Sequence, residues 1–180
     1  MRSGPVSHSD ELAGMRDRDY VPAMSESVSV TRDFSASAEK LWAMVSDVTR
    51  MGEWSPENEG GEWLSDATAA RPGARFRARN RVGKRSWRTV AAVVDAEPGR
   101  RFSFRVSAGP VKVADWAYTF EPTPNGCRVT ESWTDLRPGW FKPLARLGTG
   151  VGDRAAHNRA GMDETLERLA AVAESGSAPS

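Results

Sequence analysis

The stretch Val111–Leu136, VKVADWAYTFEPTPNGCRVTESWTDL, consists of two alternating runs separated by turn residues. The first run carries an aromatic residue at every second position: Trp116, Tyr118 and Phe120. Alternate residues of a strand point to the same side of a sheet, so these three side chains share one face. The dipeptide Asn125-Gly126 between the runs favours the tight turn of a β-hairpin. We therefore predict paired antiparallel strands here, whose aromatic face either fills a core or lines a hollow.

Further strands are predicted upstream of this hairpin. Turn signals such as Pro72-Gly73 and Pro98-Gly99 separate short runs with strand character, which cover 62–66, 74–82, 85–97 and 100–107. In the run 74–82, Arg75, Arg77, Arg79 and Arg81 alternate with Phe76, Ala78, Asn80 and Val82. This alternation predicts that the arginines form the solvent face of a strand. Consecutive strands with tight turns indicate an antiparallel meander.

Helices are predicted on either side of the meander. A first strand begins near Glu26, and the segment 35–54 follows it, with Ser37 as N-cap of one short helix and Asp47 as cap of a second that Gly52 ends. From Val151 onward, residues recur at spacings of three and four, which predicts a long amphipathic helix: Ala155, Asn158, Met162, Leu166, Leu169 and Ala173. The segment 136–153 before it, rich in Gly and Pro, is a loop or a loop with a helical turn around 144–147.

This order predicts an α+β domain in which a seven-stranded, curved antiparallel sheet wraps around the long C-terminal helix, with two short helices after the first strand. We expect one such domain over residues 25–175, a mobile leader over 1–24 and a mobile tail over 176–180. A single helix laid along a strongly curved sheet leaves unfilled volume, and such places are common ligand sites.

Three segments carry a family resemblance: DVTRMGEWSPE (47–57), GARFRARNRVGKRSWRTVAAVVDAEPGRRFSFRV (73–106) and WAYTFEPTPNGCRVTESW (116–133). They resemble the START-like (SRPBCC) superfamily with the Bet v 1-type helix-grip fold, and within it bacterial polyketide cyclase/dehydrase-like and lipid-transport-like proteins. The resemblance implies a hydrophobic cavity between the sheet and the C-terminal helix. Members bind many ligands and only some are enzymes, so the resemblance is specific for the fold and not for the function.

The expected ligand contacts are the inward aromatics, two amides and one methionine: Trp54, Phe76, Asn80, Trp87, Phe102, Phe104, Trp116, Tyr118, Phe120, Asn158 and Met162. Each aromatic has an alternative role in a filled core. Trp54 is a gate or a lid at the cavity mouth, to which the resemblance assigns its segment. Trp140 and Phe141 rim the mouth, plug it, or contact a second copy. Gly161 allows close approach to a strand or leaves room for a ligand.

Three polar residues are candidates for acid–base chemistry. If Val129 marks the inner face of its strand, Glu131 is a buried carboxylate with a raised pKa, and Arg154 is its expected partner. The alternation alone leaves the face of this strand open. On a helical wheel centred on Met162, Asn158 falls in the apolar stripe, while His157 falls toward solvent or the helix flank. The alternatives are a carrier of a small hydrophobic molecule (lipid, polyketide or aromatic compound), and a cyclase or dehydratase. In the enzyme, Glu131 or His157 is the general base and Arg154 or Tyr118 orients an oxygen. A third alternative is a protein-interaction module using Trp140 and Phe141.

Composition argues against several other classes. With 25 Lys and Arg against 24 Asp and Glu, the chain has a formal net charge of +1 and gives no reason to expect nucleic acid or acidic lipid as the main partner. One cysteine, Cys127, allows neither an internal disulfide nor a multi-cysteine metal site. No metal or cofactor motif is present, and no apolar run is long enough for stable membrane insertion. The N-terminus lacks a secretory signal, so we expect a cytoplasmic protein that is a monomer or weak homodimer.

Overall fold

A computed structural model describes residues 25–175 of the chain. Its elements are β1 (Ser27–Phe34), α1 (Ala38–Ser46), the 3-10 helix η2 (Val48–Glu53), β2 (Asn58–Trp63), β3 (Arg75–Val82), β4 (Arg85–Glu97), β5 (Arg101–Ala108), β6 (Val111–Thr123), β7 (Gly126–Asp135), η3 (Gly139–Phe141), α2 (Lys142–Thr149) and α3 (Arg154–Ser175). The expected leader and tail lie outside the described residues.

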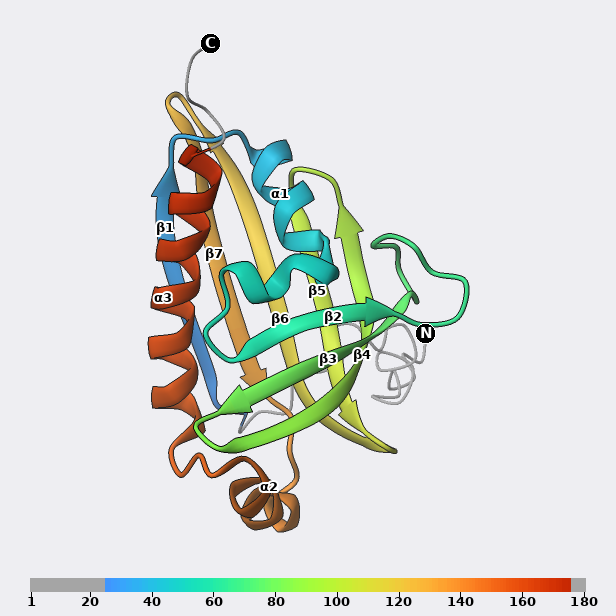
Figure 1. Ribbon diagram of the computed structural model, residues 1–180. Helices are drawn as coiled ribbons and strands as arrows, with labels where there is room; N and C mark the ends of the chain where they lie inside the picture. Colours follow the sequence, from blue (N-terminus) through green and yellow to red (C-terminus); the bar gives the residue numbers. More distant parts are fainter. Residues whose placement is uncertain (1–24, 176–180) are drawn as a thin grey trace, which may run out of the picture.

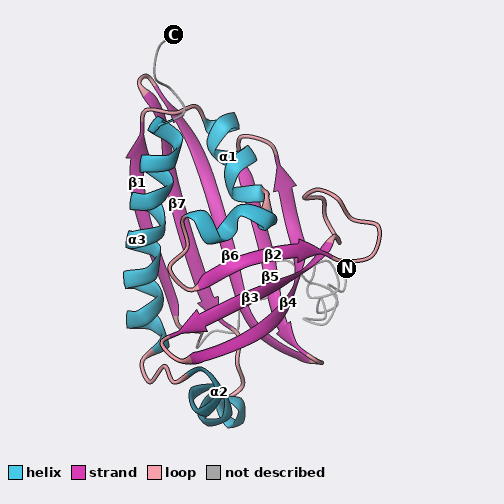
Figure 2. Ribbon diagram, viewed as in Figure 1, coloured by secondary structure: helices cyan, strands magenta, loops and turns pink. Residues whose placement is uncertain are grey.

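The seven strands form one antiparallel sheet in the order β1-β7-β6-β5-β4-β3-β2. Figure 1 shows the sheet curving so that β2, β3 and β4 cross in front of the long strands, with α3 running along the β1 and β7 side. Figure 2 shows the same arrangement by type of element, with α1 and α3 on the face toward which the sheet curls. The predicted helix-grip architecture is confirmed.

The predicted hairpin of β6 and β7 has the expected partners. Trp116 lies opposite Trp133, Tyr118 opposite Glu131 and Phe120 opposite Val129. The turn requires glycine at position 126, where φ is 148° and a Cβ would overlap the carbonyl oxygen of Phe34. The hairpin is therefore held by turn chemistry as well as by its buried face.

The two short helices form where their caps predict. Ser37 Oγ accepts a hydrogen bond from the backbone N–H of Lys40, and Asp47 accepts one from the backbone N–H of Thr49. The second helix is a 3-10 helix that continues one residue beyond Gly52. Side chains of α1 and of the second half of α3 pack against β5, β6 and β7 in one core, which includes Leu41, Val45, Phe102, Phe120, Val129, Leu166 and Leu169.

Two elements differ from the predicted ones. The strand expected at 62–66 lies four residues earlier, at Asn58–Trp63, because Ser55 and Asn58 form a turn that starts pairing sooner. The segment before α3 holds a full helix, α2, which is longer than the single turn predicted around 144–147.

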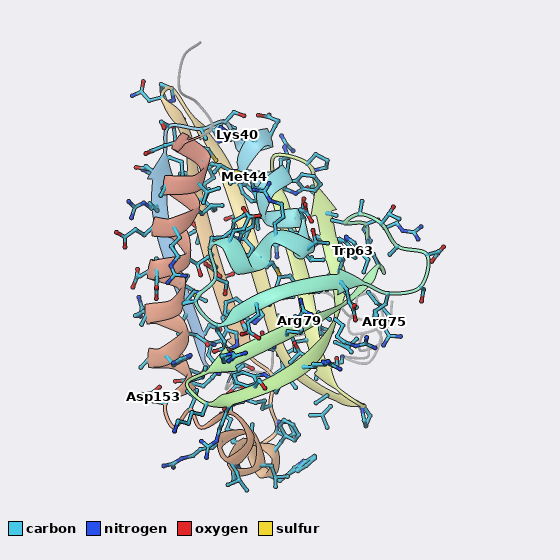
Figure 3. The ribbon with its side chains drawn as sticks, in the orientation of Figure 1. Lys40, Met44, Trp63, Arg75, Arg79 and Asp153 are labelled. Carbon is cyan, nitrogen blue, oxygen red and sulfur yellow. The ribbon has the colours of Figure 1, made fainter. Side chains whose placement is uncertain are left out.

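The solvent face of β3 is as predicted: Arg75 and Arg79, labelled in Figure 3, are exposed, while Phe76 and Ala78 are buried. Within residues 25–175, no helix is long and apolar enough to cross a bilayer.

Candidate ligand-binding cavity

A cavity of about 460 Å³ lies between the inner face of the sheet and the first half of α3. Aromatic side chains from five strands and from the end of η2 line it: Trp54, Phe76, Trp87, Phe104, Trp116, Tyr118 and Trp133. The space stays open because the residues that face one another across it are small, with Gly161 on α3 and Ala78, Ala91 and Ala114 on the sheet. Its lining reaches exposed residues, such as Pro56 and Ala160, so the cavity communicates with solvent along α3.

Nine of the eleven predicted contact residues lie in this lining: Trp54, Phe76, Asn80, Trp87, Phe104, Trp116, Tyr118, Asn158 and Met162. Phe102 and Phe120 do not, and these two take the alternative role of filling the core. Both point to the inner face, but they lie at the end of the sheet that α1 covers, where the core is filled. Strand alternation identifies the face of a residue and says nothing of whether a helix lies above it.

Glu131 points into the cavity, which answers the open question about the face of β7. Cys127, Val129, Glu131, Trp133 and Asp135 are all buried, while the residues between them are not. Glu131 accepts a hydrogen bond of 2.6 Å from the hydroxyl of Tyr118, its cross-strand neighbour. Burial raises the pKa of Glu131 to about 8, against the lowering effect of the Tyr118 hydrogen bond. The carboxyl is therefore largely protonated at neutral pH.

The predicted pair of Glu131 with Arg154 does not form. Arg154, at the start of α3, donates instead to Glu57 Oε1 at 2.6 Å, and its guanidinium lies 6.0 Å from the ring centroid of Trp87. Glu57 follows Trp54 in the loop between η2 and β2, and it is a residue for which sequence reasoning proposed no role. A loop residue has no periodicity, so no pattern placed Glu57 opposite α3.

His157 lies on the flank of α3, one of the two places that the helical wheel allows, and from there it also lines the cavity. Its Nε2 donates a hydrogen bond of 2.9 Å to Glu57 Oε2, and its side chain is part of the cavity lining. The helical wheel located His157 correctly on the flank of α3, but the loop carrying Pro56 and Glu57 covers that flank. Burial alone raises the pKa of Glu57, but hydrogen bonds from His157 and Arg154 and the charge of Arg154 outweigh it and lower that pKa.

Three buried polar atoms in the described part of the chain lack a hydrogen-bond partner: Glu131 Oε2, Arg154 Nη1 and Asn158 Nδ2. All three residues belong to the lining of this one cavity. Buried polar groups in folded proteins nearly always have partners, and the protein's own side chains supply none for these three atoms. By contrast, both polar atoms of the Asn80 amide have a partner, because Nδ2 donates to Thr89 Oγ1 and Oδ1 accepts from Asn58 Nδ2.

A second buried carboxylate ties the end of β7 to α2. Asp135 accepts two hydrogen bonds from the guanidinium of Arg137, at 2.8 and 2.9 Å, and forms an ion pair with Lys142 at 3.1 Å. Burial raises the pKa of Asp135, but its bonds to Arg137 and Lys142 outweigh that effect and lower it. Arg137, which sequence reasoning did not single out, thereby contributes its side chain to the α2 end of the cavity.

The polar groups of the site are suited to hydrogen bonding and proton transfer, and not to metal ligation. No group of three or more His, Cys, Asp or Glu side chains within residues 25–175 is arranged to hold a metal ion. The one cysteine of the chain, Cys127, is buried in the core next to Phe34 and outside the cavity lining.

Comparisons with known proteins agree with this architecture. The solution structure of a polyketide-cyclase-like protein from Corynebacterium glutamicum is 31% identical, with a TM-score of 0.57 over 84% of this chain and 93% of that one. A crystal structure of protein CV1439 from Chromobacterium violaceum is 17% identical, with a TM-score of 0.62 over 82% of this chain and 96% of that one. Ara h 8.0201, at 10% identity and a TM-score of 0.61 over 84% and 99% of the two chains, has the same fold.

A search of curated proteins finds no match. Residues 25–174, in contrast, match the family described as polyketide cyclase / dehydrase and lipid transport. That match spans nearly the whole described chain, and the neighbouring structures share the helix-grip fold. The chain therefore belongs to the polyketide cyclase/dehydrase and lipid transport family, within the START/Bet v 1-like superfamily.

Proposed function

We propose that this protein binds and carries a small hydrophobic molecule, such as a lipid, a polyketide or another aromatic compound, in the cavity between the sheet and α3. The observation that supports this most is the combination of an aromatic-lined volume of about 460 Å³ with three unpaired polar atoms in its wall. Typical small-molecule sites have volumes of about 300–1,000 Å³ and combine apolar walls with a few polar groups that fix orientation. We expect the carrier to act as a monomer or weak homodimer.

The unpaired atoms also suggest the polarity of the ligand. Arg154 Nη1 and Asn158 Nδ2 are hydrogen-bond donors, and the protonated carboxyl of Glu131 supplies a third donor through Oε2. A ligand that satisfies them carries oxygen acceptors, such as carbonyl, phenolic or carboxylate groups, on an apolar body. A pure hydrocarbon would fill the volume and leave all three groups without partners, which costs free energy.

Gly161 offers a test that leaves the fold intact. A Cβ at this position would meet only Pro56 Cγ, at 3.8 Å, so a larger side chain has room to extend into the cavity. Gly161→Leu is therefore expected to abolish binding of the fluorescent probe N-phenylnaphthylamine, while thermal stability stays equal or rises, because leucine favours a helix by about 1 kcal/mol over glycine. The matched control is Ala171→Leu, at an exposed position of the same helix outside the lining. Equal probe binding by both variants would refute a ligand site in this cavity.

Mass spectrometry of the intact protein under native conditions identifies what it carries. The expected result is a small organic molecule that is bound to the wild-type protein and missing from Gly161→Leu. A wild-type protein that takes up neither a native molecule nor the probe would contradict the carrier function directly.

A second candidate is a cyclase or dehydratase, and the two hydrogen-bonded pairs of the cavity favour it. In a dehydration, a base removes a proton next to a carbonyl group and an acid protonates the departing hydroxyl, which leaves as water. Glu131, protonated and paired with Tyr118, has the properties of the acid, and His157, paired with Glu57, has those of the base. If this function holds, a bound β-hydroxy ketone loses water, and Glu131→Gln or His157→Gln slows that loss while the probe still binds.

A further inference from the structure

The segment η3–α2 exposes large apolar side chains to an unusual degree. Within residues 25–175, the exposed large hydrophobic residues are Trp140, Leu144 and Leu147, at 64%, 58% and 74% exposure, and all three belong to this segment. No residue of α2 is buried. Because Trp140, Leu144 and Leu147 are spaced by four and three residues, they project from the same side of the helical segment. An exposed apolar group of this kind marks an interaction surface.

Basic side chains surround these three residues. The stretch 136–152 contains Arg137, Lys142 and Arg146 and no Asp or Glu. Arg85, the first residue of β4, reaches the end of α2, where a Cβ on Gly150 would contact its guanidinium. Lys142 and Arg137 pair with the buried Asp135, so the cations that remain beside Trp140, Leu144 and Leu147 are Arg85 and Arg146, and these five residues form what we term the α2 surface. Its positive charge is local, since the whole chain has a formal net charge of only +1.

The α2 surface adjoins one end of the ligand cavity. The opposite side of α2, represented by Ala145 and Thr149, lines that cavity, as do Val82 and Gly83 of the β3–β4 turn. Figure 1 shows α2 at one end of the molecule, beyond the β3–β4 turn and next to the start of α3. Asp153, labelled in Figure 3, lies at the same end, immediately before α3.

We propose that the α2 surface docks onto an anionic membrane surface, with Trp140, Leu144 and Leu147 in the headgroup region and Arg85 and Arg146 against the lipid phosphates. Short amphipathic segments with apolar side chains on one face and basic residues beside them lie in such interfaces. Tryptophan is well suited to the boundary, because its ring is apolar and its indole N–H forms hydrogen bonds. With eight residues, α2 is too short to span a bilayer, so docking is peripheral.

Charge decides between a membrane and a second copy of the chain as the occupant. A two-fold dimer through this surface would bring Arg85 and Arg146 of each copy together, which is unfavourable. An anionic bilayer instead satisfies the cations and the apolar side chains at once. Docking in this orientation turns the α2 end of the cavity toward the lipid, so an apolar ligand would exchange without crossing bulk water. The docking itself does not depend on the proposed carrier function.

The test is co-sedimentation of the full chain with two kinds of vesicle, phosphatidylcholine alone and phosphatidylcholine mixed equally with phosphatidylglycerol. We expect binding to the mixed vesicles that weakens with added salt, and little binding to phosphatidylcholine alone. Arg85→Gln with Arg146→Gln should lower the affinity about 30-fold, at roughly one kcal/mol for each basic residue near the surface. Trp140→Ser with Leu147→Ser should reduce binding to the level seen with phosphatidylcholine.

The matched control is Arg75→Gln with Arg79→Gln, which removes two exposed arginines of β3 while leaving the α2 surface intact. This variant should bind mixed vesicles within about threefold of wild type. Failure of the wild-type protein to bind mixed vesicles would overturn the proposal, as would unchanged binding by both α2 variants. A concentration-dependent dimer that Trp140→Ser with Leu147→Ser dissociates would overturn it in favour of a second copy. Probe binding without vesicles is measured separately, so failure of the docking and failure of the carrier function are distinguishable.

Discussion

Tyr118 and Glu131 face each other across the β6–β7 hairpin and share a hydrogen bond of 2.6 Å in the buried wall of the cavity. Because both side chains are buried, the neutral carboxyl is favoured and the phenol also stays protonated, with its pKa raised well above its usual value by burial and by Glu131. The aromatic strand of the hairpin thus supplies a polar partner for a carboxyl group that would otherwise be isolated, and only Oε2 of that group is left unpaired.

The raised pKa of Glu131 makes stability depend on pH. The folded protein holds a proton up to about pH 8, whereas the unfolded chain releases it near the ordinary value of 4.5. The free energy of unfolding contributed by Glu131 is therefore full below about pH 4.5 and is lost as the pH rises through about 8. At 1.36 kcal/mol for each pH unit, the total loss is at most about 5 kcal/mol.

Urea denaturation at a series of pH values measures this effect, with Glu131→Gln as reference. Glutamine has nearly the same shape and does not titrate, so the other groups of the protein contribute equally to both curves. The wild-type free energy of unfolding should decrease relative to that of Glu131→Gln between about pH 4.5 and 8. Parallel curves across this interval would contradict a buried, protonated Glu131.

The Tyr118–Glu131 bond predicts coupling between the two residues. Tyr118→Phe leaves Glu131 Oε1 without its partner and should destabilise the fold by about 1–3 kcal/mol. In the double variant Tyr118→Phe with Glu131→Leu, neither polar group remains. The double variant should therefore be less destabilised than the sum of the two single variants, by an interaction free energy of about 1–2 kcal/mol. Additive effects in chemical denaturation would contradict a direct bond.

Much of the fold follows from local patterns. The Asn125-Gly126 turn, the caps Ser37 and Asp47 and the spacing of apolar residues along α3 each act within a few neighbouring residues, and each has its predicted effect. The helix α2 was less predictable, because none of its side chains is buried. Because α2 buries no side chain, its sequence has no apolar stripe that packs against a core. Its exposed leucines are equally compatible with a loop.

The candidate site was less predictable than the fold, since its polar contacts join segments far apart in the chain. Glu57 and Arg154 are separated by 97 positions, and Glu57 lies in a loop that no periodicity describes. The predicted Glu131–Arg154 pair rested on two residues that both face the cavity, but facing one cavity does not bring two side chains into contact. Phe102 and Phe120 illustrate the same point, because their face was predictable and the position of α1 above them was not.

Glu57 is predicted to hold the first turn of α3 against the loop after η2. Glu57→Gln removes the charge that pairs Arg154 and His157, and it should destabilise the protein by about 1–2 kcal/mol at neutral pH, since the cluster is partly screened by solvent. The lowered pKa of Glu57 means that its contribution is full above the ordinary value of 4.5 and is lost as the pH falls through the folded-state pKa. The difference between wild type and variant should therefore shrink in acid.

The matched control for this experiment is Glu59→Gln. Glu59 also pairs with an arginine, Arg81, but both side chains are far more exposed, at 39% and 60%. Its removal should change the free energy of unfolding by less than about 1 kcal/mol. Equal effects of Glu57→Gln and Glu59→Gln in urea denaturation would show that Glu57 adds nothing beyond a surface ion pair.

Asn158 and Asn80 form the sharpest comparison in the cavity, because both amides are buried in its lining but only one has partners. Asn158 Nδ2 has none, whereas Asn80 bonds Thr89 and Asn58. Asn158→Leu should therefore leave the stability of the ligand-free protein unchanged or raise it by about 1 kcal/mol, because it removes an unpaired buried amide. Asn80→Leu should lower stability by about 1–3 kcal/mol, since it removes the partner of Thr89 Oγ1 and of Asn58 Nδ2.

If Asn158 donates to the ligand, Asn158→Leu also weakens the binding of an oxygen-bearing native ligand. This loss should exceed the loss for N-phenylnaphthylamine, and isothermal titration compares the two directly. A strong destabilisation by Asn158→Leu would instead identify its amide as a structural group of the fold.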